Sequence, residues 1–257
     1  ESSFGLVAGG SLARITAGDF DGDGFVDLAY GDGRVFFGNG GTVWTPGPQL
    51  GAALQTLGVA AGDFDGDGRD DLVIGGYSQD RLWAFRGNAN RTFTAANNGL
   101  PNGPMSGGND VLLVDVTGDG HLDIVWDRVY AGDGLGNWSV DTGVAGNGGL
   151  GFGVAAGDLD GDGVLEIVHA NSTQGVAVHR HLGGNQWAPA GNLQPPGRYV
   201  YAVALLDYDR DGRLDLVFGF QDATNGLELW RNLGGMQFAP VPNSGLPAST
   251  SYDVRNL

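Results

Sequence analysis

Five nine-residue segments of this chain carry oxygen side chains at alternating positions. They read DFDGDGFVD from residue 19, DFDGDGRDD from 63, DVTGDGHLD from 115, DLDGDGVLE from 158 and DYDRDGRLD from 207. Oxygen side chains occupy positions one, three, five and nine of each segment, and glycine always occupies position six. Calcium takes 6–8 oxygen ligands, and loops that bind it supply them from alternate positions around a glycine turn. The chemistry that these segments predict is calcium binding, one ion per loop and about five in all.

The predicted ligands are the side chains at positions one, three, five and nine and the backbone carbonyl at position seven. In chain order they are Asp19, Asp21, Asp23, Phe25 and Asp27; Asp63, Asp65, Asp67, Arg69 and Asp71; Asp115, Thr117, Asp119, His121 and Asp123; Asp158, Asp160, Asp162, Val164 and Glu166; and Asp207, Asp209, Asp211, Arg213 and Asp215. Thr117 leaves the third loop with three carboxylates, so this loop should bind calcium most weakly. Five ions carrying two charges each would move the net charge from −17 to −7.

Two other calcium motifs do not fit. An EF-hand needs a bidentate glutamate at position twelve and flanking helices, whereas position twelve here is Tyr30, Ile74, Trp126, His169 and Phe218. Calcium-binding β-roll repeats have a nine-residue period, and these loops start 43 to 52 residues apart. Without metal, each close pair of carboxylates in a loop repels by roughly 1–4 kcal/mol. Calcium should therefore stabilise the native state.

The segments between the loops repeat as well, and they predict the fold. A short apolar run follows each loop, then a second strand-like segment, a glycine-rich turn and an aromatic residue, as in VFFGNGGTVW and AFRGNANRTF. Such runs bounded by glycine and asparagine are typical of strands and hairpins, and no segment has a sustained helical period. Four antiparallel strands every ~45 residues predict an all-β fold, a β-propeller of four-stranded blades with the calcium loop between the first and second strands. A two-sheet sandwich is the alternative, but it does not predict such regular repetition.

The predicted organisation is a single β-propeller domain over 1–257. Its repeat units cover 11–49, 55–98, 109–143, 150–191 and 199–241, with terminal strands at 2–8 and 250–257. The terminal strands either pair in a partial closing blade or belong to a longer propeller, and the second reading is favoured.

The second loop and the strands that follow it resemble a repeat of a known family. GDFDGDGRDDLVIGG followed by FRGNANRTF is similar to the FG-GAP/VCBS repeat, whose blades carry a D-x-D-x-D-G-x-x-D calcium loop between two strands. The resemblance implies a β-propeller like those of integrin α heads and of certain lectins. Two residues depart from the pattern: Thr117 replaces the third-position acid, and Arg210 replaces the fourth-position glycine.

Composition excludes several functions. The net charge of −17 argues against nucleic acid as a partner. All 13 basic residues are arginine, which excludes a lysine nucleophile, and there is no cysteine. No apolar run approaches the ~20 residues of a membrane-spanning helix. The acids outside the loops, among them Asp80, Asp127, Asp141 and Glu228, form no recognisable acid–base pair, and no catalytic motif is present. An enzyme is not expected.

Histidine and tryptophan offer two further candidate sites. His169, His179 and His181 could bind zinc or nickel or sense pH, although the favoured reading is that histidine fills an aromatic slot of the repeat. Trp44, Trp138 and Trp187 recur at the fourth-strand position, which indicates packing between blades. Trp83 falls outside the repeated slots, and with Arg81 and Arg86 it is the predicted ligand contact.

The function expected is that of a secreted, calcium-stabilised and non-catalytic binding module. The resemblance implies a lectin-like module with carbohydrate as ligand, and extracellular calcium is abundant enough to fill weak loops. One alternative is a protein-binding, adhesion or self-assembling scaffold module with an extracellular protein or a second copy as partner. Another is the non-catalytic portion of a larger secreted enzyme.

Overall fold

The computed structural model describes most of the chain. The described residues are 14–51, 56–76, 82–101, 110–141, 144, 151–171, 175–193, 199–220 and 226–247. The terminal strands expected at 2–8 and 250–257, together with Asp80 and Arg81, lie outside them. Among the described residues, no helix is long and apolar enough to cross a membrane.

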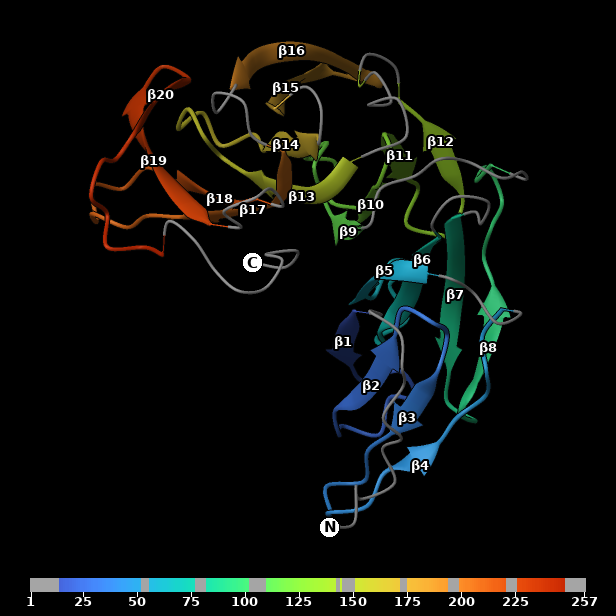
Figure 1. The fold of residues 1–257 in the computed structure, drawn as a ribbon. Helices are drawn as coiled ribbons and strands as arrows, with labels where there is room; N and C mark the ends of the chain where they lie inside the picture. The colour runs from blue at the N-terminus through green and yellow to red at the C-terminus, as the bar shows by residue number, and fades with distance from the viewer. Residues whose placement is uncertain are drawn as a thin grey trace. The chain divides into compact units, whose positions relative to one another are not determined.

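The described chain forms five sheets, each of four strands in sequence order (Figure 1). The strands pair antiparallel, which confirms the four-stranded repeat predicted from the sequence. The first two sheets contain β1 (Ile15–Gly18), β2 (Asp27–Tyr30), β3 (Val35–Phe37) and β4 (Thr45–Pro46), then β5 (Thr56–Gly62), β6 (Asp71–Gly76), β7 (Leu82–Asn88) and β8 (Thr92–Ala95). The third contains β9 (Leu112–Val114), β10 (Asp123–Val125), β11 (Val129–Gly132) and β12 (Trp138–Val140). The last two contain β13 (Gly151–Gly157), β14 (Glu166–Asn171), β15 (Gly175–Gly183) and β16 (Gln186–Leu193), then β17 (Val200–Leu206), β18 (Asp215–Phe220), β19 (Leu227–Gly234) and β20 (Gln237–Pro240).

The chain divides into two compact units, the first containing most of the first three sheets and the second containing the fourth and fifth. In the first unit, β6 is buried on both faces. Leu72 and Ile74 pack in one hydrophobic cluster and Val73 in another, because successive side chains of a strand point to opposite faces. This explains why the run after the second loop is continuously apolar.

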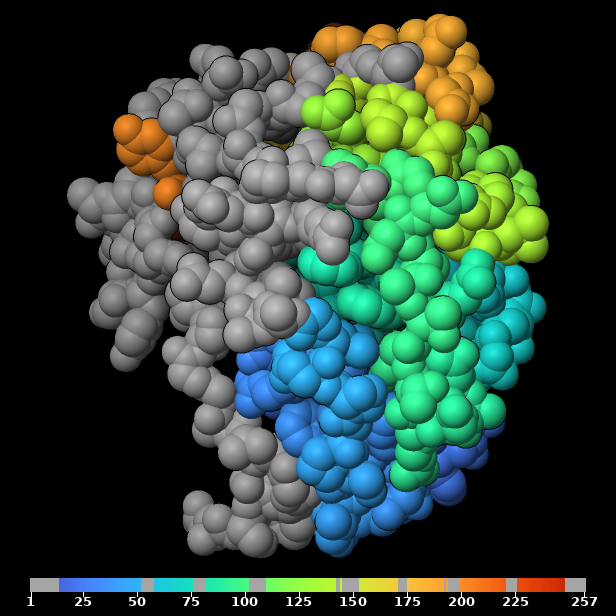
Figure 2. All heavy atoms as spheres, turned by 90° about the vertical axis from the view of Figure 1, so that its right-hand side faces the viewer, coloured from blue at the N-terminus to red at the C-terminus, as the bar shows by residue number. Residues whose placement is uncertain are grey.

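Aromatic residues of the fourth strands join neighbouring sheets in the first unit. Phe93 of β8 lies 5.9 Å from Phe20 and 6.3 Å from Phe37, measured between ring centroids. Trp138 of β12 lies 5.1 Å from Phe64, edge to face. In the space-filling view, atoms of the first sheet (blue) and the second (teal to green) form one continuous surface (Figure 2). The predicted role in packing between sheets is thus confirmed for Trp138.

The second unit packs the fourth and fifth sheets around one cluster that includes Val168, Val178, Leu216, Phe218 and Trp230. A glycine in the first strand allows this close approach. A Cβ atom on Gly153 would lie 2.9 Å from the Cα atom of Ala202 in β17. The two first strands can therefore approach at this point only if the residue in β13 lacks a side chain.

Candidate metal centre

The first aspartate of each loop organises the turn. In the second loop, Asp63 Oδ1 accepts the backbone N–H groups of Gly66 and Asp67 at 2.7 and 3.1 Å, and Oδ2 accepts that of Gly68 at 2.9 Å. Aspartate commonly binds backbone N–H groups of its own turn in this way. Similar bonds are made by Asp19, Asp115, Asp158 and Asp207. The turn thus places a carboxylate at its centre.

Positions four and six of the loops require a left-handed backbone. Gly66 and Gly68 have φ values of 76° and 87°, which glycine adopts without steric cost. Arg210, the one residue that replaces glycine at position four, has a φ value of 61°. The fifth loop therefore keeps the same backbone path and carries steric strain at Arg210.

The ninth-position acid connects the loop to the sheet. Asp71 is fully buried, and its two oxygens accept the N–H groups of Phe64 at 3.1 Å and of Gly87 in β7 at 2.9 Å. The residues at this position in the other loops are also fully buried and accept backbone N–H groups: Asp27, Asp123, Glu166 and Asp215. This acid is therefore a structural brace as well as a predicted ligand.

Four loops bring three carboxylates together. In each, one oxygen from positions one, three and nine lies within 4.8 Å of the others: Asp19, Asp21 and Asp27; Asp63, Asp65 and Asp71; Asp158, Asp160 and Glu166; Asp207, Asp209 and Asp215. Oxygen donors of this kind suit a hard cation such as calcium. Two buried oxygens in these groups, Asp65 Oδ1 and Glu166 Oε1, have no hydrogen-bond partner. Since a buried carboxylate oxygen without a partner is costly, the residues fit a bound cation.

The fifth-position acid is not part of these groups. It turns to the seventh residue instead: Asp67 Oδ1 accepts the Arg69 N–H at 3.0 Å, and Asp162 Oδ1 accepts the Val164 N–H at 2.8 Å. Arg69 also pairs with Asp67 through its guanidinium group, and its Nε donates to the Gly87 carbonyl at 3.2 Å. The sequence did not predict this side-chain role at position seven.

The third loop differs from the others as its sequence predicts. Thr117 removes the carboxylate at position three, so of the positions that form these groups only positions one and nine carry an acid, and the loop is not among the three-carboxylate groups of the described residues.

Burial raises the free energy of the ionised form of the ninth-position acids. It raises the pKa of Asp71 to about 7 and that of Asp27 to about 6, and the pKa of Glu166 is raised for the same reason. Backbone hydrogen bonds oppose the shift in each case. A cation bound nearby would favour the ionised forms.

The predicted ligand contact at Trp83 is not assembled as expected. Trp83 stacks on Phe85 with ring centroids 6.1 Å apart. Arg86 lies on the opposite face of β7, because the two positions differ by an odd number of residues, and its Nε pairs with Asp65 Oδ2 at 3.0 Å. The structure therefore does not bring Trp83 and Arg86 together.

The acids outside the loops have individual partners in the described structure. Asp127 pairs with Arg128 at 3.0 Å, and the buried Asp141 accepts the indole N–H of Trp187 at 2.9 Å. Glu228 accepts the indole N–H of Trp230 at 3.1 Å.

His169 and His179 occupy a slot that is aromatic in other sheets. Both are buried, and their rings meet edge to face with centroids 5.8 Å apart. The equivalent pair in the first sheet, Tyr30 and Phe36, has the same separation of 5.8 Å. His181 lies apart from the pair, against Trp187 at 4.9 Å. This geometry supports the reading that histidine fills an aromatic slot.

The histidine pair predicts acid sensitivity. Burial lowers the pKa of His179, so protonation opposes folding and stability falls as pH drops below the unfolded value near 6.5. At pH 5 the loss reaches at most about 2 kcal/mol for this residue. We expect His179→Phe to flatten the decline in melting temperature between pH 7 and 5. An unchanged decline would show that other groups cause it.

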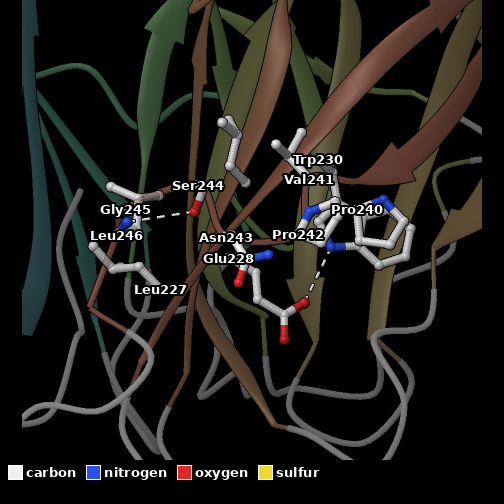
Figure 3. Close-up of a pocket in the computed structure, with 11 residues that line it drawn as sticks. Leu227, Glu228, Trp230, Pro240, Val241, Pro242, Asn243, Ser244, Gly245 and Leu246 are labelled. Carbon is white, nitrogen blue, oxygen red and sulfur yellow. Dashed lines mark hydrogen bonds between the residues drawn. The ribbon is translucent and has the colours of Figure 1, made fainter.

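A pocket of about 680 Å³ lies beside β19 in the second unit (Figure 3). Its walls combine apolar and polar side chains but include no basic residue. They are formed by Leu227, Glu228, Leu229, Trp230, Pro240, Val241, Pro242, Asn243, Ser244, Gly245 and Leu246. In the close-up, Glu228 and Asn243 lie near each other between the tryptophan and Ser244. No sequence pattern predicts this pocket, because its polar residues belong to no repeated motif.

Comparison with known proteins agrees with the loop-and-sheet unit. A model of the FG-GAP-like repeat family matches residues 19–74 and 63–126. A search of curated proteins returned no match. Among solved structures, the V. cholerae biofilm matrix protein Bap1 is similar at 19% identity and a TM-score of 0.52, over 92% of this chain and 40% of its own.

Two further solved structures are similar at lower TM-scores. The Photorhabdus luminescens Tc holotoxin pore matches over 94% of this chain and 12% of its own, at 20% identity and a TM-score of 0.38. BBS1N in complex with ARL6DN matches over 93% of this chain and 84% of its own, at 15% identity and a TM-score of 0.43. The chain thus spans less than half the length of the toxin and of Bap1. Residues 19–126 therefore match the FG-GAP-like repeat directly, and the same loop and four-stranded sheet recur over 151–193 and 199–240.

Proposed function

We propose that this chain is the calcium-stabilised, non-catalytic binding module of a secreted protein, and that its ligand is carbohydrate. The observation that carries the proposal is the pocket beside β19. It is large enough for a small ligand, since typical ligand pockets measure about 300–1,000 Å³. Its polar groups converge among apolar walls, as ligand sites generally require.

The pocket suits a neutral sugar. Glu228 offers a carboxylate and Asn243 an amide, and both can bind vicinal hydroxyl groups. Pro240, Pro242 and the edge of Trp230 supply apolar surface for the C–H groups of a pyranose ring. The absence of a basic side chain among the lining residues disfavours sialic and uronic acids, whose carboxylates Glu228 would repel.

A glycan array in millimolar calcium tests the proposal. We expect binding to neutral saccharides, and Glu228→Gln should weaken it roughly tenfold or more, since hydrogen bonds to a charged group contribute about 1.5–3 kcal/mol. Trp83→Ala serves as the control outside this pocket and should leave affinity unchanged. If only Trp83→Ala weakens binding, the module is a lectin with its site on β7. If no saccharide binds, the carbohydrate proposal is wrong.

A role in adhesion or matrix assembly is the second candidate. It is favoured by the similarity to Bap1, which is described as a biofilm matrix protein. This role predicts no saccharide binding but self-association, or capture of an extracellular protein, measured by sedimentation and pull-down in calcium. A place within a larger secreted enzyme remains compatible with either binding role.

A further inference from the structure

We infer that the loops are not equivalent calcium sites: the fourth loop is the principal one, and arginines of this chain neutralise the first, second and fifth loops. This inference concerns the metal sites and does not depend on the carbohydrate proposal. It rests on which loop carboxylates are already paired with guanidinium groups.

In the first loop the guanidinium comes from the neighbouring sheet. Arg91, in the turn between β7 and β8, places Nε 2.6 Å from Asp21 Oδ2 and Nη2 3.0 Å from Asp23 Oδ2. The side chain of Asp21 is only 3% exposed. The same guanidinium lies over the Phe37 ring at 5.3 Å. Arg91 is therefore held in place on three sides.

The second and fifth loops use an arginine from their own third strand. Arg86 of β7 places Nε 3.0 Å from Asp65 Oδ2, and Arg231 of β19 places Nε 2.7 Å from Asp209 Oδ2. The two arginines occupy the same strand position, since each immediately precedes the residue whose backbone N–H binds the ninth-position acid. Arg231 also pairs with Asp211 at 2.9 Å. In all three loops the third-position carboxylate, a member of the metal-binding group, is paired with an arginine, and the fifth-position acid is paired as well.

The fourth loop has no such partner. None of Asp158, Asp160 and Glu166 forms an ion pair in the described structure, and position seven is Val164 instead of an arginine. Arg180 of β15 stands at the strand position of the two paired arginines, but it is exposed and forms no ion pair with the loop. Glu166 Oε1 is moreover buried without a hydrogen-bond partner.

This difference changes the cost of binding a cation. In the paired loops, calcium must displace a guanidinium from a carboxylate that it needs as ligand. Ion pairs of this exposure shift an equilibrium by up to about fivefold each, so one or two of them weaken calcium binding roughly three- to twentyfold. In the fourth loop, calcium binding breaks no ion pair. The loop carboxylates attract the ion with their full negative charge, and Glu166 Oε1, which has no hydrogen-bond partner, gains the ion as a ligand.

Calcium titration by calorimetry, with equilibrium dialysis for stoichiometry, tests the inference. We expect one tightly bound ion per chain and weaker binding at the remaining loops. Asp160→Asn should abolish the tight class, whereas the matched changes Asp21→Asn, Asp65→Asn and Asp209→Asn should leave it intact. Circular dichroism of each variant confirms that it is folded.

Neutralising the arginines provides the reverse test. Combining Arg91→Gln, Arg86→Gln and Arg231→Gln should tighten the three weak sites roughly three- to twentyfold, while Arg180→Gln should change nothing. Equal affinities at all loops in the natural chain would overturn the inference. So would a tight class that survives Asp160→Asn, or a fourth loop that binds more tightly after Arg180→Gln.

Discussion

Replacing Asp71 by alanine will lower the free energy of unfolding by about 2–4 kcal/mol in calcium-containing buffer. Both oxygens of this buried carboxylate accept backbone N–H groups, one from Phe64 in the loop and one from Gly87 in β7. Alanine leaves both N–H groups buried without an acceptor, and each such group costs about 1–3 kcal/mol. Urea denaturation followed by tryptophan fluorescence measures the change.

Asp67→Ala is the matched control, since it removes one carboxylate from the same loop. The side-chain carboxylate of Asp67 bonds to Arg69, and it lies outside the three-carboxylate group. We expect this variant to lose less than about 1 kcal/mol, as is usual for exposed ion pairs. Equal losses in the two variants would show that the ninth-position brace is not what holds the loop to the sheet.

Much of the fold follows from local chemistry and could be predicted from the sequence. The loops repeat because positions four and six need a left-handed backbone, which glycine supplies; even Arg210 adopts it, with a φ value of 61°. Fourth-strand aromatics such as Phe93 and Trp138 recur where they pack on a neighbouring sheet, as Phe93 does on Phe20. Because these requirements recur in each sheet, the residues that meet them recur at regular intervals in the sequence.

The hydrogen-bond and ion-pair partners of the individual loop carboxylates could not be predicted in this way. Spacing alone predicts the fifth-position acid as a ligand, and it does not show that the carboxylate of Asp67 also accepts the N–H of Arg69. The pairing of Arg91 with Asp21 joins residues 70 positions apart, and no local pattern reports it. By contrast, the separation of Trp83 and Arg86 onto opposite faces of β7 follows from strand alternation, and counting positions would have revealed it.

Calcium will raise the melting temperature of this protein, and the fourth loop will account for most of the rise. A ligand at a hundred times its dissociation constant stabilises the native state by about 2.7 kcal/mol per site. In a chain of this size, that corresponds to a shift of roughly 5–10 °C. The native carboxylates favour such an ion, because burial already raises the pKa of Asp71 to about 7 and so makes its uncompensated charge unfavourable.

Differential scanning calorimetry in millimolar calcium, and again in excess chelator, measures this shift. Magnesium at the same concentration is the control: it requires a tighter octahedral shell and loses its water reluctantly, so it should give a smaller rise. Asp160→Asn should remove most of the calcium effect, because it takes one oxygen from the loop that no arginine neutralises. A melting temperature that is the same in calcium and in chelator would mean that hydrogen bonds and arginines alone hold these loops, and that their carboxylates serve the fold without a metal.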